Sequence, residues 1–204
     1  MTPTKPTKPR AATPTSARPL PSSPPVLHFE DAAAWESWLA EHHGEEGGAW
    51  LMIARKGSSV TAVTIDEARD VALCYGWIDS HRKAHDEHCF LQRYSRRRKG
   101  SPWCRVNADR AEELAAGGRM RPPGEAEIEA ARADGRWAAA YTPQSTTTVP
   151  PDLAGALAAD PAAAARFEAL DRTARYLLIL PLLKARTPAT RAARLRKAVD
   201  GLHG

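Results

Sequence analysis

The stretch that decides the fold is TIDEARDVALCYGWIDSHRKAHDEHCFLQRY, residues 64–94. Thr64 followed three residues later by Glu67 forms a capping box, in which each side chain bonds to the other residue's backbone amide. This pattern predicts a helix over residues 65–75, and Gly76 is the residue type that commonly ends one. A helix that passes directly into a strand-like segment is the first sign of a mixed fold.

Residues 78–94 contain two strand-like runs on either side of residues 84–87, which predicts an antiparallel hairpin. Further along, Ser101 and Pro102 are the residue types favoured at the N-cap and first position of a helix. Gly117 and Gly118 would end that helix, whose inward face would carry Trp103, Val106 and Leu114. Another helix is expected over residues 123–135, with Glu125, Glu127 and Glu129 near the positive end of its dipole.

Upstream of the capping box, residues 49–56 are apolar and rich in β-branched and aromatic side chains, which predicts a buried strand. Before that run, Asp31 is placed to cap a short helix. The spacing of Trp35, Trp38 and Leu39 puts these three side chains on one face, and that face is expected in the core.

The C-terminal third is expected to be helical, because Asp160, Asp171 and Thr187 each occupy a suitable N-cap position. Its last helix, residues 188–202, would bury a narrow stripe made of Ala192, Leu195, Val199 and Leu202. The predicted fold class is therefore α+β, a small antiparallel sheet packed by helices and followed by a C-terminal helical segment.

The predicted domain organisation is a disordered tail followed by one domain. Residues 1–25 are dominated by Pro, Thr, Ser, Ala, Lys and Arg, and they have too few large apolar residues to offset the entropy of ordering. Residues 26–204 are expected to form one domain with an α+β part, 26–148, and a helical part, 149–204.

The net charge of +5 is unevenly distributed along the chain. Residues 1–25 carry +4, residues 26–160 carry −5 and residues 161–204 carry +6. The basic ends suggest an anionic partner, whereas the acidic middle argues against a general nucleic-acid binder.

Composition also predicts the cellular compartment. No apolar run is long enough to span a membrane, and the lysine-containing N-terminus lacks the apolar segment of a secretory signal. Cys74, Cys89 and Cys104 are odd in number and have no CxxC spacing, which favours a reducing environment. We therefore expect a cytoplasmic protein without a membrane span; the sequence gives no oligomeric state.

The densest candidate site is an arginine-rich segment leading into the helix that Ser101 would cap. Guanidinium groups and free backbone amides there would form an anion-binding surface for phosphate or carboxylate. The alternative is a solvated basic loop that only pairs with nearby acidic helices. The predicted anion-binding residues are Arg93, Arg96, Arg97, Arg98, Ser101 and Trp103.

A second candidate is a polar corner made of Trp77, Asp79 and Arg82. A buried Asp79 facing Arg82 or Arg97 would be an ion pair that fixes the turn from helix to hairpin, without any catalytic role. As a catalytic carboxylate, Asp79 lacks an obvious partner of complementary pKa.

Metal and cofactor sites have little support. His81, His85, His88 and Cys89 invite a metal site, but their spacing matches no zinc motif. The common nucleophile, phosphate-loop, dinucleotide and zincin motifs do not occur. We therefore predict no metal and no cofactor.

Several motifs, in their order along the chain, resemble the YdeI/OmpD-associated family. They are Ala68, residues 72–79 (ALCYGWID), residues 94–97 and 101, Trp103, Asn107, residues 118–120, residues 134–137 (DGRW) and residues 185–191 (ARTPATR). The resemblance runs from about residue 27 to the end of the chain, and it adds Asn107 to the predicted anion-binding residues.

The chain departs from this pattern in the arginine segment. The family usually has Phe-Thr-Pro-Arg-Arg where residues 94–98 are YSRRR, and serine where this chain has Cys104. Without the proline, the segment is less rigid and more basic.

The resemblance implies a role in protection against bacteriocins and cationic antimicrobial peptides, without a defined reaction. Our first hypothesis is a non-enzymatic stress or protection protein that recognises an anionic ligand through the arginine segment. The second is a nucleic-acid-binding module that uses the same segment and the basic last helix. The third is an enzyme that acts on a small anionic substrate through Asp79 and Arg97.

Overall fold

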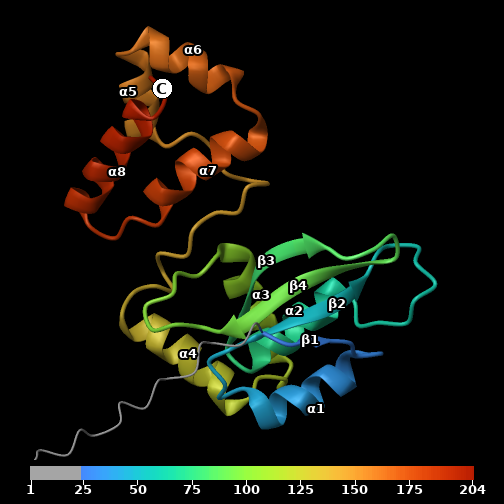
Figure 1. The fold of residues 1–204 in the computed structure, drawn as a ribbon. Coiled ribbons are helices and arrows are strands. Elements are labelled where there is room, and N and C mark those ends of the chain that lie inside the picture. Colours follow the sequence, from blue (N-terminus) through green and yellow to red (C-terminus); the bar gives the residue numbers. More distant parts are fainter. Residues whose placement is uncertain (1–23) are drawn as a thin grey trace, which may run out of the picture.

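The structure is a computed structural model that describes residues 24–204 (Figure 1). Apart from Pro24 and Pro25, the segment predicted to be a disordered tail lies outside the described residues. None of the helices in the described part of the chain is long and apolar enough to cross a membrane.

Four strands and eight helices make up residues 24–204. The strands are β1 (Val26–Leu27), β2 (Ala49–Ala54), β3 (Trp77–Ala84) and β4 (Cys89–Arg96). The helices are α1 (Ala32–His42), α2 (Ile65–Cys74), α3 (Arg105–Ala116), α4 (Pro122–Ala133), α5 (Pro151–Ala158), α6 (Pro161–Ala169), α7 (Arg172–Leu183) and α8 (Pro188–Asp200). This content confirms the α+β prediction.

The sheet has the strand order β1-β2-β4-β3. The β3–β4 hairpin is antiparallel, as predicted, and β4 also pairs antiparallel with β2. The prediction of an entirely antiparallel sheet is wrong, because β1 pairs parallel with β2. Helix α1 carries the chain back between these two strands, so β2 enters the sheet in the same direction as β1.

The predicted capping box is present at the start of α2. The Thr64 hydroxyl accepts from the Glu67 amide at 3.3 Å, and the Glu67 carboxylate accepts from the Thr64 amide at 3.0 Å. Gly76 follows the helix with a positive φ of 71°. At this φ an L side chain is strained, so glycine lets the chain leave α2 and enter β3 directly.

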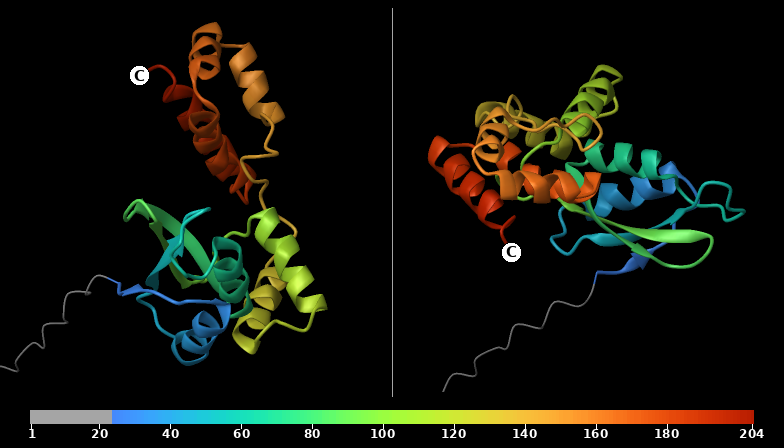
Figure 2. Two further views of the ribbon diagram at one scale, coloured as in Figure 1. Left: turned by 90° about the vertical axis from the view of Figure 1, so that its right-hand side faces the viewer. Right: turned by 90° about the horizontal axis from the view of Figure 1, so that it is seen from above.

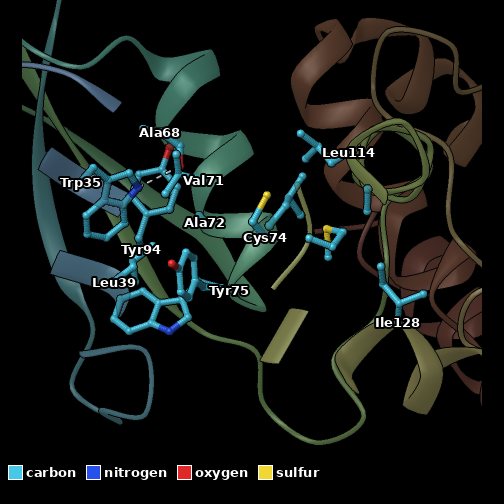
Figure 3. Packing of buried hydrophobic residues seen from close by; sticks show 14 of the residues in the cluster. Trp35, Leu39, Ala68, Val71, Ala72, Cys74, Tyr75, Tyr94, Leu114 and Ile128 are labelled. Carbon is cyan, nitrogen blue, oxygen red and sulfur yellow. Dashed lines mark hydrogen bonds between the residues drawn. The ribbon is translucent and has the colours of Figure 1, made fainter. Parts of the chain in front are cut away.

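Most of the buried apolar side chains form a first cluster between the sheet and helices α1–α4 (Figure 3). Trp35 and Leu39 of α1 are buried there as predicted, and the Trp35 indole donates to the Ala68 carbonyl at 3.1 Å. Ala68 and Val71 on α2 face this contact, so a tryptophan side chain joins α1 to α2 within the core.

Helices α5–α8 pack around a second, smaller cluster, and in two views they lie away from the sheet (Figures 1 and 2). Its buried members are Leu153, Leu157, Ala163, Phe167, Ile179, Leu182 and Leu202. The predicted caps Asp160, Asp171 and Thr187 all bond to the first turns of their helices. In the predicted stripe of α8, however, Ala192 is exposed.

The predicted start of the third helix is wrong. Helix α3 begins at Arg105 rather than after Ser101, and Cys104 is its N-cap. The Arg105 amide donates to the Tyr141 carbonyl and the Tyr141 amide donates to the Trp103 carbonyl, which keeps this backbone extended. The later start rotates the helix face: Val106 is 44% exposed, whereas Ala108, Ala111 and Leu114 are buried.

Helix α4 approaches the end of α2 so closely that only glycine fits at position 124. A Cβ on Gly124 would collide with the Cys74 carbonyl and would lie 2.7 Å from Cε of Met120. Gly155, the glycine within α5, has no atom within 4 Å of the corresponding position.

We predict opposite effects for Gly124→Ala and Gly155→Ala. The first substitution must push α4 away from α2 and should lower the free energy of unfolding by about 1–3 kcal/mol. The second should leave it unchanged or raise it by up to about 1 kcal/mol, since alanine restricts the unfolded chain. Urea unfolding of both variants measures this, and equal effects would contradict the close approach.

One domain spanning residues 26–204 remains a prediction, and the tryptophans allow it to be tested. All six lie between Trp35 and Trp137, so their fluorescence reports on the first cluster, whereas far-ultraviolet circular dichroism also reports on α5–α8. One cooperative domain predicts coincident urea transitions by the two methods. A separate transition seen only by circular dichroism would mean that the helical part unfolds independently.

Candidate anion-binding site

The candidate site lies where β4 leaves the sheet and the chain turns toward α3. The Arg97 amide donates to the Gly76 carbonyl at 3.0 Å, which fixes the start of this turn against the end of α2. The Ser101 amide donates to the Arg98 carbonyl at 2.9 Å and closes the turn. This backbone points the Arg97 side chain into the protein and leaves those of Arg96 and Arg98 outside.

Arg97 is the central residue of the site, because its side chain is charged and yet only 3% exposed. Its guanidinium carbon lies 3.5 Å from the centre of the Trp103 ring, and Trp103 is itself buried. One guanidinium nitrogen, Nη1, donates a long hydrogen bond of 3.4 Å to the Pro102 carbonyl. Stacking on a buried indole stabilises the cation but satisfies none of its N–H donors.

The stacked pair of Arg97 and Trp103 carries three unpartnered donors. Within residues 24–204, neither Nε nor Nη2 of Arg97 has a hydrogen-bond partner, and neither does Nε1 of Trp103. Buried donors without partners are rare, since each loses its bonds to water on folding. They therefore mark a place where a ligand or a water molecule would complete the structure.

The free atoms of Arg97 are those with which other arginines here hold carboxylates. Arg110 uses Nε and Nη2 to bind both oxygens of Asp70, at 2.9 and 2.5 Å. Arg191 uses the same two atoms for Asp152, at 2.7 and 2.9 Å. The edge of Arg97 is thus the one suited to a planar carboxylate or a phosphate, and no acidic side chain of the described chain occupies it.

Electrostatics agrees with this geometry. Burial lowers the pKa of Arg97 to about 10, and the negative charge of Glu127 opposes that change only in part. The nearby positive charge of Arg136 contributes to this lowered pKa, whereas Asp79, like Glu127, opposes it. A bound anion would favour the charged form of Arg97 and reverse this shift.

Arg136, which follows α4, is a second buried arginine that bonds to this turn, and it shows how a structural arginine is satisfied. It is 4% exposed, its Nε lies 2.7 Å from a carboxylate oxygen of Asp134, and its Nη1 donates to the Ser101 carbonyl at 2.9 Å. Two buried guanidinium groups therefore bond to consecutive carbonyls, those of Ser101 and Pro102, but only Arg136 has a carboxylate.

The other residues of the predicted anion site do not converge on Arg97. Arg93 is half-buried in β4 and donates to the Gly47 carbonyl at 3.0 Å. Arg96 and Arg98 are exposed, and Asn107 is half-buried in the first turn of α3. Ser101 contributes its carbonyl to Arg136 rather than a helix cap to the site. The structure thus brings together only Arg97 and Trp103, beside Ser101.

The predicted polar corner has a different arrangement from the one expected. Asp79 is exposed rather than buried, and no ion pair within residues 24–204 involves it. Arg82 instead donates to Oε1 of Gln92 at 3.1 Å, and the indole of buried Trp77 donates to the His43 carbonyl at 2.8 Å. Asp79 is exposed like every later residue of β3, whereas Trp77 at the start of the strand is buried.

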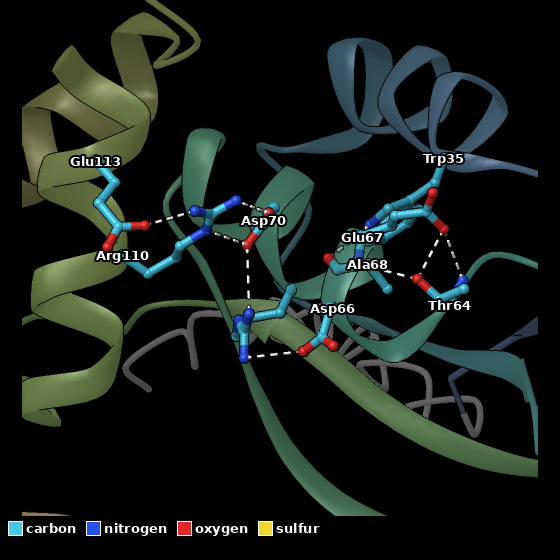
Figure 4. A network of polar contacts seen from close by, with 9 residues as sticks. Trp35, Thr64, Asp66, Glu67, Ala68, Asp70, Arg110 and Glu113 are labelled. Atoms are coloured by element: carbon cyan, nitrogen blue, oxygen red, sulfur yellow. Dashed lines mark hydrogen bonds and ion pairs between the residues drawn. The ribbon is translucent and has the colours of Figure 1, made fainter. Parts of the chain in front are cut away.

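The carboxylates around α2 have structural roles (Figure 4). Burial alone would raise the pKa of Asp70, but the hydrogen bonds and charge of Arg110 lower it overall. The hydrogen bond from the Thr64 hydroxyl lowers the pKa of Glu67. Within residues 24–204, no three His, Cys, Asp or Glu side chains are grouped so that they could hold a metal ion.

Sequence reasoning missed Arg136 and its neighbour Trp137 as parts of this site. Trp137 meets Trp103 edge to face, with ring centres 4.7 Å apart. Arg136 and Trp137 both belong to the DGRW motif at 134–137, which the sequence analysis used only for the family resemblance. The signal available in the sequence was an arginine next to a tryptophan. No local pattern relates these two residues to Arg97.

Fold and site together describe the class of protein. An α+β part contains a buried arginine without a carboxylate partner, and a helical part with its own hydrophobic cluster follows it. Comparison with known families divides the chain in a similar way. Residues 27–127 match a domain of unknown function (DUF8412). Residues 146–203 match the family described as bacteriocin-protection, YdeI or OmpD-associated, which confirms that resemblance for the C-terminal segment.

Neither the curated proteins nor the solved structures contain a match to this chain. The arginine turn lies inside the region matched by the domain of unknown function, whereas the ARTPATR motif at 185–191 lies inside the bacteriocin-protection match.

Arg97→Met and Arg136→Met form a matched pair that tests whether Arg97 is a structural residue. Arg136→Met removes an ion pair and the bond to Ser101, and should lower the free energy of unfolding by about 1–3 kcal/mol. Arg97→Met keeps the packing on Trp103 and removes unpartnered donors, so the change should stay below about 1 kcal/mol. Urea unfolding in a chloride-free buffer checks both values, and an equal loss would assign Arg97 a structural role.

Proposed function

We propose that this protein protects cells against bacteriocins or cationic antimicrobial peptides by recognising an anionic ligand at the Arg97–Trp103 pair. Two observations support the proposal: the bacteriocin-protection family match at residues 146–203, and the buried Arg97 edge that has no carboxylate partner. The second observation carries the ligand class, since a buried guanidinium fork is suited to a carboxylate or phosphate.

Electrostatics argues for an indirect mode of protection. The chain carries a net charge of +5, and a cationic peptide would be repelled by its basic C-terminal part. An anionic partner bound at Arg97 avoids this repulsion and could link the protein to an envelope component or to regulation. Arg97 would supply the charge, and Trp103 would hold the guanidinium in one orientation.

The two alternative functions have weaker support. Nucleic-acid binding through the last helix would use the exposed Arg196 and Lys197, since Arg191 pairs with Asp152. Unlike Arg97, neither is a buried cation with unpartnered donors. An enzyme using Asp79 with Arg97 would need these side chains together. Asp79 instead lies exposed on β3, and no ion pair within residues 24–204 joins it to Arg97.

The experiment is deletion of the gene in its host, followed by survival against a cationic antimicrobial peptide. Complementation with the wild type should restore survival, and complementation with Arg97→Met should not. The control, Arg96→Gln with Arg98→Gln, removes two exposed charges and should restore it, because these residues do not reach the buried site. Unchanged survival on deletion would refute the protection role.

A second measurement tests anion binding directly, without relying on the survival phenotype. Small anions such as phosphate and acetate should raise the melting temperature of the wild type, because a ligand that binds only the folded state stabilises it. This rise should be absent in Arg97→Met and retained in the control variant. Equal stabilisation of all three proteins would show that the anions act without Arg97.

A further inference from the structure

A second cationic site lies at the far end of the sheet, away from the Arg97 turn. The ends of the β3–β4 hairpin and the segment after β2 extend together beyond the helices (Figure 1). The Arg55 amide donates to the His88 carbonyl at 2.8 Å and holds these two segments side by side. At this end of the sheet is an open depression of about 400 Å³, here called the hairpin cleft. It is lined by Arg55, Lys56, Arg82, Lys83, Ala84 and Phe90.

The hairpin cleft concentrates positive charge without compensation. Four of its six lining residues are arginine or lysine, and no carboxylate is among them. Within residues 24–204, none of these four cations forms an ion pair. Asp86 of the adjoining turn is not among the lining residues, and its carboxylate accepts from the amides of His88 and Cys89.

Three of the four cations are held in place by neutral partners. Arg82 lies 4.2 Å from the centre of the Phe90 ring and donates to the buried Gln92. Lys83 lies 4.2 Å from the centre of the Trp50 ring. Arg55 donates to the Asp86 carbonyl at 3.3 Å. Neutral partners fix the positions of the cations but leave their charges available to a ligand.

The aromatic rings indicate what kind of anion would bind. Arg82 covers one face of Phe90, and the ring also packs against the first hydrophobic cluster. Lys83 likewise covers Trp50. A nucleobase binds such surfaces by stacking on an open aromatic face. Here the rings serve to position cations, so the cleft is suited to the phosphates of a ligand rather than to its base.

We propose that the hairpin cleft binds a small, multiply charged phosphate, such as a di- or triphosphate group. Arg55 and Arg82 flank Phe90 on one face of the sheet, and exposed Lys56 lies next to Arg55, so these three cations supply the charge for such a group. The Lys83 ammonium instead lies over Trp50 on the opposite face. Arginine forks bind phosphate oxygens in pairs. The site is separate from Arg97 and does not depend on the proposed function.

Calorimetric titration of the full chain with inorganic tripolyphosphate tests this proposal. Arg82→Gln should weaken binding by at least about tenfold, the range for loss of charge-assisted hydrogen bonds. Lys56→Gln should also weaken it, and it leaves the fold undisturbed because Lys56 is exposed and makes no ion pair within residues 24–204. Raising the salt from about 50 mM to about 300 mM should weaken binding further by screening the charges.

Arg98→Gln is the matched control, since it removes one exposed positive charge outside the cleft. It should leave the affinity unchanged, as should Arg97→Met. If Arg98→Gln weakens binding as much as Arg82→Gln does, only net charge matters and the proposal fails. If Arg97→Met alone abolishes binding, tripolyphosphate occupies the buried site and the proposal also fails.

Two further ligands test whether the cleft binds the phosphate groups alone, a nucleotide or a nucleic acid. Adenosine triphosphate should bind as tightly as tripolyphosphate, because the cleft offers no free ring face for the base. A clear preference for the nucleotide would overturn the proposal. Displacement of tripolyphosphate by a single-stranded oligothymidylate at a lower concentration of phosphate groups would overturn it in favour of nucleic acid. The absence of tripolyphosphate binding at millimolar concentration would also refute it.

Discussion

The close packing of α2 against its neighbours is the constraint on which the first part of the structure depends. Helix α2 contacts α1, β3, α3 and α4, so it touches almost every element around the first hydrophobic cluster. Its C-terminal end meets α4 where Gly124 leaves no room for a side chain, and Gly76 then turns the chain into β3. The Gly76 carbonyl also accepts a hydrogen bond from the Arg97 amide. The position of the candidate site therefore follows from the end of this helix.

The arginines discussed above fall into two groups: those whose guanidinium group forms an ion pair with a carboxylate, and those without such a partner. Arg110, Arg191 and Arg136 each pair with an aspartate. The first two pairs join α3 to α2 and α8 to α5, whereas the pair of Arg136 lies within the DGRW motif and its bond to the Ser101 carbonyl joins that motif to the turn before α3. Arg97 is as buried as Arg136 and more buried than Arg110 or Arg191, yet it has no such partner. The cations of the hairpin cleft are exposed, and three of the four are held by neutral groups. Buried charge is tolerated only where it is paired, and that rule makes the exceptions informative.

Much of the fold could be predicted from local patterns. The capping box of α2, the hairpin, and the caps Asp31, Asp160, Asp171 and Thr187 depend on residues close together in the sequence. Two predictions failed because distant segments decide them. The parallel β1–β2 pair follows from the crossover through α1, and the later start of α3 follows from the pairing of Trp103 and Arg105 with Tyr141.

The sequence by itself determined where most of the helices and the three longer strands lie, and that residues 93–105 are rich in arginine. Only the tertiary structure decided that Arg97 alone of this segment is buried, that Trp103 covers it, and that the charges of Glu127 and Arg136 act on it. The physical reason is the range of the interactions. Caps and periodicity act over three or four residues, whereas charge pairing joins residues far apart in the sequence, such as Arg110 and Asp70, 40 residues apart, or Arg121 and Glu36, 85 residues apart.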